Sequence, residues 1–233
     1  MVHDERPPHV TTMSVRVPAG EQWLHGDFGM PLNPHGLVLF AHGSGSSRRS
    51  SRNQFVARAL EQQGLATLLI DLLTEEEEAI DRRTAHLRFD IEMLAGRLVE
   101  IVEWLRRHEL SASLPIGLFG ASTGGGAALV AAAARPKDIA SVVSRGGRPD
   151  LAGSALSRVT APTLFIVGGL DREVLQMNRD AMSHMRSEVV LEIVPGATHL
   201  FEEPGTLEQV AVLATAWFHR HLQAAERATG ARR

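Results

Sequence analysis

The chain has 233 residues, no cysteine and a formal net charge of −3 at pH 7. The lack of cysteine excludes disulfides and thiolate metal sites, and the small net charge gives no sign of a polyanionic partner or a membrane surface. The first ten residues are polar, and no apolar run reaches the ~18 residues that span a bilayer, so we expect a cytoplasmic protein.

Apolar patterns predict strands and helices in alternation. The continuous apolar run 37–41 is typical of a strand buried on both faces, whereas residues 13–17 alternate like a half-buried strand. Apolar residues spaced by three and four from Leu87 to Leu105 indicate a long amphipathic helix. In chain order, the predicted strands are 13–17, 21–27, 37–41, 65–70, 115–119, 140–144, 162–167 and 189–193. The predicted helices are 52–63, 87–105, 127–134, 173–185 and one that opens at a capping-box pattern, 206–209.

This alternation predicts an α/β fold, with a doubly wound, mostly parallel sheet in a single domain over residues 11–223. Residues 1–10 are expected to form a loose tail, and 224–233 a polar one. No segment is long enough for a separate cap domain. Residues 72–83 are expected to form a loop in which the acidic run from Glu75 to Glu78 is exposed to solvent.

The segment Gly120-Ala121-Ser122-Thr123-Gly124 lies between a predicted strand and a predicted helix. Three fixed positions of this kind occur by chance about 0.1 times in a chain of this length and composition, so the context carries the signal. A sharp turn between strand and helix holds a serine hydroxyl above the sheet, at the positive end of a helix. The context therefore favours Ser122 as a nucleophile over a simple helix cap.

Ligands of open α/β sheets bind beyond the carboxyl ends of the strands. Ser122, Asp171 and His199 each follow a predicted strand directly, in the order serine, acid, histidine. A serine hydroxyl needs a base to take its proton, an imidazole titrates near neutrality, and a carboxylate can orient that imidazole. Asp150 is the rival acid, one strand earlier, but the sharp turn at Gly168-Gly169 leads straight into Asp171.

A serine nucleophile generates a tetrahedral oxyanion that needs two hydrogen-bond donors. We expect one from the backbone N–H of Thr123 and the other from the loop after residue 42, at the N–H of Ser44. His42 is expected to order this loop rather than to act on the substrate.

Other charged residues near the strand ends have two interpretations. Arg145 and Arg148 could bind a carboxylate or phosphate on a substrate, but a structural ion pair, with Asp150 for example, is favoured. Asp71 ends a strand upstream of the serine and is expected to cap a turn or to pair with an arginine such as Arg48.

Several other sites find no support in the sequence. The run Gly43 to Ser46 lacks the Gly-Lys-Ser/Thr ending of a nucleotide-binding loop. The basic residues Arg48, Arg49 and Arg52 have no aromatic residues interleaved with them that could stack on bases. No His-x-x-His pair or carboxylate cluster suggests a metal. We therefore expect no cofactor, no metal and no nucleic-acid partner.

From about Val15 to Leu222 the chain resembles a lid-less α/β-hydrolase of the dienelactone-hydrolase-like group. The motifs that carry the resemblance are Ala41-His42-Gly43-Ser44-Gly45, Gly120-Ala121-Ser122-Thr123-Gly124, Gly169-Leu170-Asp171 and Ala197-Thr198-His199. The resemblance implies hydrolysis of an ester or a related acyl compound without a cofactor. Dienelactone hydrolases proper use a cysteine nucleophile, and its absence here favours a serine esterase.

The sequence thus predicts a serine hydrolase that cleaves a small ester or thioester through an acyl-enzyme. In this hypothesis Ser122 is the nucleophile, His199 the general base and Asp171 the orienting acid. The alternatives are a non-catalytic protein of the same fold that binds a ligand or partner in the pocket, and an interaction module that docks through Glu75–Glu78. The sequence leaves the oligomeric state open between monomer and homodimer.

Overall fold

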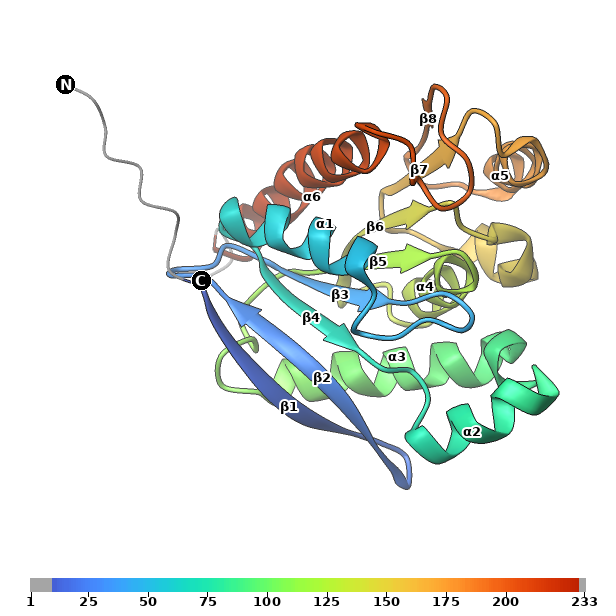
Figure 1. Ribbon diagram of the computed structural model, residues 1–233. Coiled ribbons are helices and arrows are strands. Elements are labelled where there is room, and N and C mark those ends of the chain that lie inside the picture. Colours follow the sequence, from blue (N-terminus) through green and yellow to red (C-terminus); the bar gives the residue numbers. More distant parts are fainter. Residues whose placement is uncertain (1–9, 231–233) are drawn as a thin grey trace.

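The computed structural model describes residues 10–230 (Figure 1). The predicted tail at 1–10 lies outside these residues, apart from Val10. The strands are β1 (Thr11–Ala19), β2 (Gln22–Met30), β3 (Leu37–Ala41), β4 (Ala66–Ile70), β5 (Ile116–Ala121), β6 (Ile139–Arg145), β7 (Thr163–Gly168) and β8 (Val189–Val194). The α-helices are α1 (Ser51–Gln62), α2 (Glu75–Thr84), α3 (Ile91–Arg107), α4 (Thr123–Ala134), α5 (Arg172–His184) and α6 (Thr206–Gly230). Two 3₁₀ segments, η1 (Leu87–Phe89) and η2 (Pro149–Arg158), complete the described elements.

The strands form one sheet of eight in the order β1-β2-β4-β3-β5-β6-β7-β8. Strand β2 pairs antiparallel with β1 and β4, and all other neighbours are parallel. The predicted α/β class and mostly parallel sheet are therefore confirmed. Because the strands from β3 onward run in parallel, their carboxyl ends meet at one edge, and the predicted site residues come together there.

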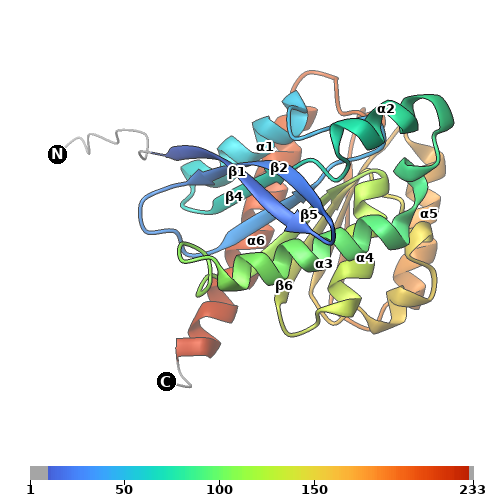
Figure 2. The ribbon, with the colours of Figure 1, turned by 90° about the horizontal axis from the view of Figure 1, so that it is seen from below.

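Helices cover both faces of the sheet, and this explains the apolar strands at its centre. Helices α1 and α6 pack on one face, and α3, α4 and α5 on the other, as Figures 1 and 2 show from two directions. Every residue of β3, β4 and β5 is buried, because alternate side chains enter the two apolar layers. Within residues 10–230, no helix combines the length and the apolarity needed to span a bilayer.

The prediction of a loop at Glu75–Glu78 is wrong, although Glu75 and Glu76 are exposed to solvent as expected. These residues form the first turn of α2, where their negative charge is stabilised by the N-terminal end of the helix dipole. The Thr74 hydroxyl accepts from the Glu77 N–H (3.2 Å) and the Glu77 carboxylate accepts from the Thr74 N–H (2.8 Å), which is a complete capping box. The same carboxylate binds the guanidinium of Arg97 on α3 (2.5 and 2.7 Å), so Glu77 is structural.

Two helix boundaries also differ from the prediction. The long helix α3 begins at Ile91, behind an Asp90 cap, because Leu87–Phe89 form a separate 3₁₀ turn. Helix α6 continues to Gly230, so the expected polar tail at 224–233 begins inside a helix. No capping box opens this helix: Thr206 is its first residue, and its hydroxyl donates to the carbonyl of Glu203 instead (2.7 Å).

Candidate active site

Ser122 occupies the sharp turn between β5 and α4. Its φ of 50° lies in the left-handed region, which a residue other than glycine rarely adopts. Close packing forces small residues around it: a Cβ on Gly120 would lie 2.5 Å from the carbonyl oxygen of Gly124, and a Cβ on Gly124 would lie 2.3 Å from that of Ala41. The turn is fixed by its neighbour β6, because the Ser122 N–H donates to the carbonyl of Arg145 (3.2 Å).

Asp171, His199 and Ser122 form a continuous hydrogen-bonded chain. His199 Nδ1 lies 2.6 Å from Asp171 Oδ2, and Nε2 lies 3.3 Å from Ser122 Oγ. A carboxylate can only accept, so Nδ1 carries the proton and Nε2 is free to accept from the serine hydroxyl. The Asp171 side chain is 14% exposed and that of His199 38%. The rival acid, Asp150, instead binds the guanidinium of Arg148.

The loop after β3 lies against the serine. A Cβ on Gly43 would come within 3.0 Å of both Ser122 Cβ and the Ala121 carbonyl oxygen, so only glycine permits this approach. The next residue, Ser44, forms a side-chain hydrogen bond with Thr123 (3.0 Å between the two hydroxyl oxygens). The Thr123 N–H belongs to the first turn of α4, where backbone donors have no acceptor within the helix. The two residues predicted to form an oxyanion hole therefore lie side by side.

His42 holds this loop in place. The Leu72 N–H donates to His42 Nε2 (2.9 Å), so Nδ1 carries the proton and donates to the Gly43 carbonyl (2.9 Å). Burial lowers the pKa of His42 below its ordinary value of 6.5 and keeps the ring neutral. The ring thus joins the ends of β3 and β4, which agrees with the ordering role expected for it.

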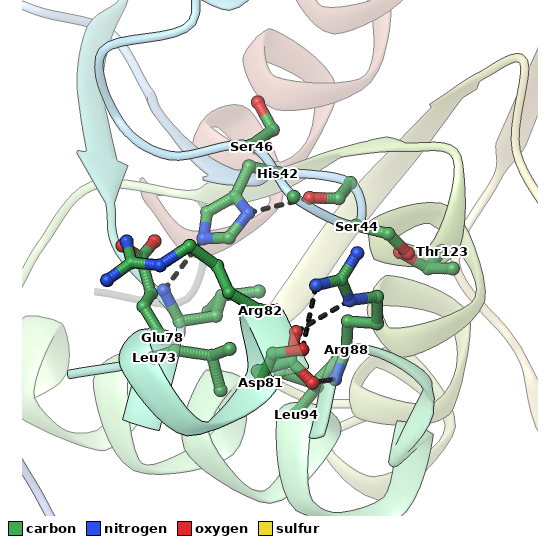
Figure 3. A pocket seen from close by; sticks show the side chains of 13 residues that line it. His42, Ser44, Ser46, Leu73, Glu78, Asp81, Arg82, Arg88, Leu94 and Thr123 are labelled. Carbon is green, nitrogen blue, oxygen red and sulfur yellow. Dashed lines mark hydrogen bonds and ion pairs between the residues drawn. The ribbon is translucent and has the colours of Figure 1, made fainter. Parts of the chain in front are cut away.

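A cavity of about 120 Å³ opens beside Ser44 and Thr123 (Figure 3). Its apolar lining comes from the segment after β4 and from α3, as Leu72, Leu73 and Leu94. An ion pair between Arg88 and the buried Asp81 also lines the cavity: Arg88 donates through Nε to Asp81 Oδ2 (2.6 Å) and through its backbone N–H to Oδ1 (3.1 Å). The remaining lining residues are His42, Gly43, Gly45, Ser46, Glu78 and Arg82.

The sequence interpretation missed this side of the cavity because it treated residues 72–83 as a loop. The spacing of Thr74 and Glu77 is the signal that could have revealed α2. A helix from Glu75 onward would have placed Asp81 on a packed element close to η1 and Arg88.

Neither of the arginines considered for substrate binding lines the cavity. Arg148 makes a bidentate ion pair with Asp150 (2.8 and 2.7 Å), as the favoured interpretation of the sequence predicted. The ion pair expected for Arg145 does not form among residues 10–230: this residue is buried beneath the ring of Phe201, with its guanidinium carbon 5.7 Å from the ring centroid. The expected pair of Asp71 with Arg48 is confirmed by a side-chain ion pair and by a backbone hydrogen bond from Arg48 (2.7 Å).

Within residues 10–230, no three histidine or acidic side chains gather where they could hold a metal ion. The groups that the structure brings together at the site are the serine hydroxyl, the imidazole, the carboxylate and the backbone donors beside them.

The comparisons with known proteins identify the family of the chain. A sequence model of the dienelactone hydrolase family matches residues 29–229. The chain belongs to this family. A solved structure of a dienelactone hydrolase from Anabaena variabilis superposes with a TM-score of 0.90 and 58% identity, over 91% of this chain and 99% of that one. Est1E from Butyrivibrio proteoclasticus is more distant, with a TM-score of 0.75 and 15% identity over 89% of this chain and 98% of its own, and shows the shared fold alone.

This member of the dienelactone hydrolase family is also 56% identical over 215 residues to a protein of Mycobacterium tuberculosis, found in two strains. The provisional name of that relative is phosphoribosyl transferase. The match covers 92% of this chain but 48% of the relative, so the chain spans about half the length of the curated relatives that it matches. The name therefore describes a protein of about twice this length.

Proposed function

We propose that the protein is a serine hydrolase that cleaves small esters or thioesters. The observation that carries the proposal is the chain from Asp171 through His199 to Ser122, with spacings of 2.6 and 3.3 Å. His199 Nε2 takes the hydroxyl proton while Ser122 Oγ attacks the substrate carbonyl. The proton then passes to the leaving alcohol or thiol, and an acyl-enzyme remains. A water molecule, deprotonated by the same nitrogen, releases the acid.

In this proposal the tetrahedral oxyanion binds to backbone N–H groups of Thr123 and Ser44. The contact of Gly43 with Ser122 and the Ser44–Thr123 hydrogen bond support it, because they bring both backbones to the nucleophile. Removal of one such donor typically costs ~3 kcal/mol of transition-state stabilisation. Asp171 supports the imidazolium that forms when His199 takes the proton.

A small substrate is favoured by the cavity next to Ser44 and Thr123. Its volume of about 120 Å³ and the leucine side chains in its wall suit a short acyl or alkyl group. A thioester presents the same carbonyl to the serine, so the geometry supports both classes.

The proposal is tested by active-site labelling with a fluorophosphonate probe, read by intact mass. Wild type should gain one adduct, and Ser122→Ala should gain none. The matched control is Ser157→Ala, which removes an exposed hydroxyl on η2 and should label at the wild-type rate. A panel of p-nitrophenyl esters and thioesters of graded acyl length then defines the substrate.

Absence of an adduct on folded wild type at pH 8 would refute the proposal that the protein is a serine hydrolase. The alternative, a protein that binds a ligand without turnover, would then be pursued by calorimetry with the same esters. Equal labelling of Ser122→Ala would place the reactive nucleophile elsewhere.

A further inference from the structure

Arg145, at the end of β6, is a buried cation without a counter-ion. The residue is 6% exposed, and no acidic side chain among residues 10–230 pairs with it. Its Nε atom is buried and has no hydrogen-bond partner among residues 10–230. Burial and, to a lesser degree, the like charge of Arg52 lower the pKa of Arg145 to about 10, so it remains charged at neutral pH. An unpaired buried charge is costly, which calls for a compensating interaction.

The compensating interaction is a cation–π contact with the ring of Phe201. The guanidinium carbon of Arg145 lies 5.7 Å from the ring centroid, within the range in which a cation is attracted to an aromatic face. Phe201 is 2% exposed and has a φ of 55°. A bulky residue in this left-handed conformation is strained, so the surrounding contacts must hold it there.

Phe201 closes the turn that carries His199. Its N–H donates to the carbonyl of Thr198 (3.3 Å), which makes His199 the second residue of a four-residue turn. The other end of the turn is fixed by Glu203, whose carboxylate accepts from the Thr198 N–H (3.1 Å) and hydroxyl (2.6 Å). The base therefore lies between two anchors, Glu203 at one end and the contact between Phe201 and Arg145 at the other.

The same arginine also touches the nucleophile. Its carbonyl accepts the N–H of Ser122 (3.2 Å). The next residue, Gly146, packs so closely that a Cβ there would lie 3.3 Å from the His199 carbonyl oxygen and 3.5 Å from its ring. One short segment thus holds the backbone of Ser122 and the turn of His199.

We propose that Arg145 is a positioning residue, which holds Phe201 and with it the His199 turn at the distance from Ser122 that proton transfer needs. This role rests on the proposed hydrolase function. It differs from substrate binding, because the guanidinium lies under the turn and outside the lining of the cavity.

The test is a double-mutant cycle with Arg145→Met and Phe201→Leu, which keep buried bulk but remove the charge and the ring. For each single variant we expect kcat on a p-nitrophenyl ester to fall roughly 10- to 100-fold, the effect of a small misplacement of a catalytic group. KM should stay within about twofold, because neither side chain lines the cavity. The double variant should lose no more than the worse single variant, since both changes break the same contact.

Two further variants separate positioning from general damage. Arg145→Lys retains a cation beneath the ring and should recover most of the lost kcat. Arg16→Met is the matched control: it removes a second arginine–aromatic contact, with Trp23 at 5.3 Å on the β1–β2 hairpin, and should leave kcat unchanged. Thermal unfolding of every variant shows whether it is folded. If Arg145→Met does not fold, the kcat of Phe201→Leu tests the proposal.

The proposal would be overturned if folded Phe201→Leu or Arg145→Met kept kcat within twofold of wild type. It would also be overturned if the two losses multiplied in the double variant, because independent effects imply no shared contact. These results are separable from failure of the proposed function. If the proposed function fails, wild type itself shows no fluorophosphonate adduct. If only the proposal for Arg145 fails, wild type is still labelled.

Discussion

Asp171→Asn tests the most exacting part of the proposed mechanism, the tautomer of His199. The carboxylate accepts a hydrogen bond from the Nδ1–H group (2.6 Å from Nδ1 to Oδ2), so that Nε2, 3.3 Å from Ser122 Oγ, carries no proton. An asparagine of the same shape can donate its amide hydrogen to Nδ1, which favours the tautomer with the proton on Nε2. That tautomer cannot accept the serine proton.

The expected loss follows from this change of tautomer. In a serine protease the same replacement lowers kcat about 10⁴-fold, and at 1.36 kcal/mol per decade four decades are about 5.4 kcal/mol. We expect a loss of this order here, because the Asp171 side chain is 14% exposed and little water can substitute for its charge. The assay is kcat/KM on p-nitrophenyl acetate, together with the rate of fluorophosphonate labelling.

The matched control is Asp150→Asn, the same change in the carboxylate one strand earlier. Asp150 is paired with Arg148 at 2.7 and 2.8 Å, so its loss should change kcat/KM less than threefold, a small effect for an exposed ion pair. The reasoning would be refuted if folded Asp171→Asn retained more than a tenth of wild-type activity. It would equally be refuted if Asp150→Asn lost as much as Asp171→Asn.

Three further predictions concern stability. Gly124→Ala should lower the free energy of unfolding by about 1–3 kcal/mol or more, because its Cβ would lie 2.3 Å from the Ala41 carbonyl oxygen; urea unfolding measures this, and an unchanged midpoint would contradict it. Thr74→Ala removes the capping box of α2 and should cost about 1 kcal/mol in the same assay, whereas Thr12→Ala, at an exposed position of β1, should cost less. The pKa of His42 is lowered in the folded state, so the unfolded state binds the proton first as pH falls. The contribution of His42 to the free energy of unfolding should therefore be complete above pH 6.5 and decline below it. His42→Asn should make the pH dependence of the free energy of unfolding shallower between pH 7.5 and 5.5.

The sequence was sufficient to predict that three residues of the candidate site would lie together. Ser122, Asp171 and His199 each follow an apolar strand, and parallel strands bring such residues to one edge whatever the details of packing. The choice of Asp171 over Asp150 rested on the turn before it, and the hydrogen bond to His199 agrees with that choice. These features need no knowledge of which side chains meet across the molecule.

The parts that failed depend on contacts between distant segments or on competing local signals. The acidic run at Glu75–Glu78 was judged by its charge, but Thr74 caps it and Arg97 binds Glu77 from another helix. Burial of Arg145 could not be predicted either. An arginine at the end of a strand is usually exposed, and this one is covered by a loop that begins more than fifty residues later, at His199.

The order of the strands gives the site an uneven resistance to local opening. Ser122 follows β5, a fully buried strand in the middle of the sheet, whereas His199 follows β8, an edge strand with a neighbour on one side only. Edge elements open with less free energy than the centre, as amide hydrogen exchange reveals in many proteins. Partial release of β8 would carry His199, the proposed base, away while the turn that holds Ser122 stayed folded. Activity should therefore vanish at lower denaturant concentrations than the bulk helical signal, so that turnover reports the integrity of the sheet's edge.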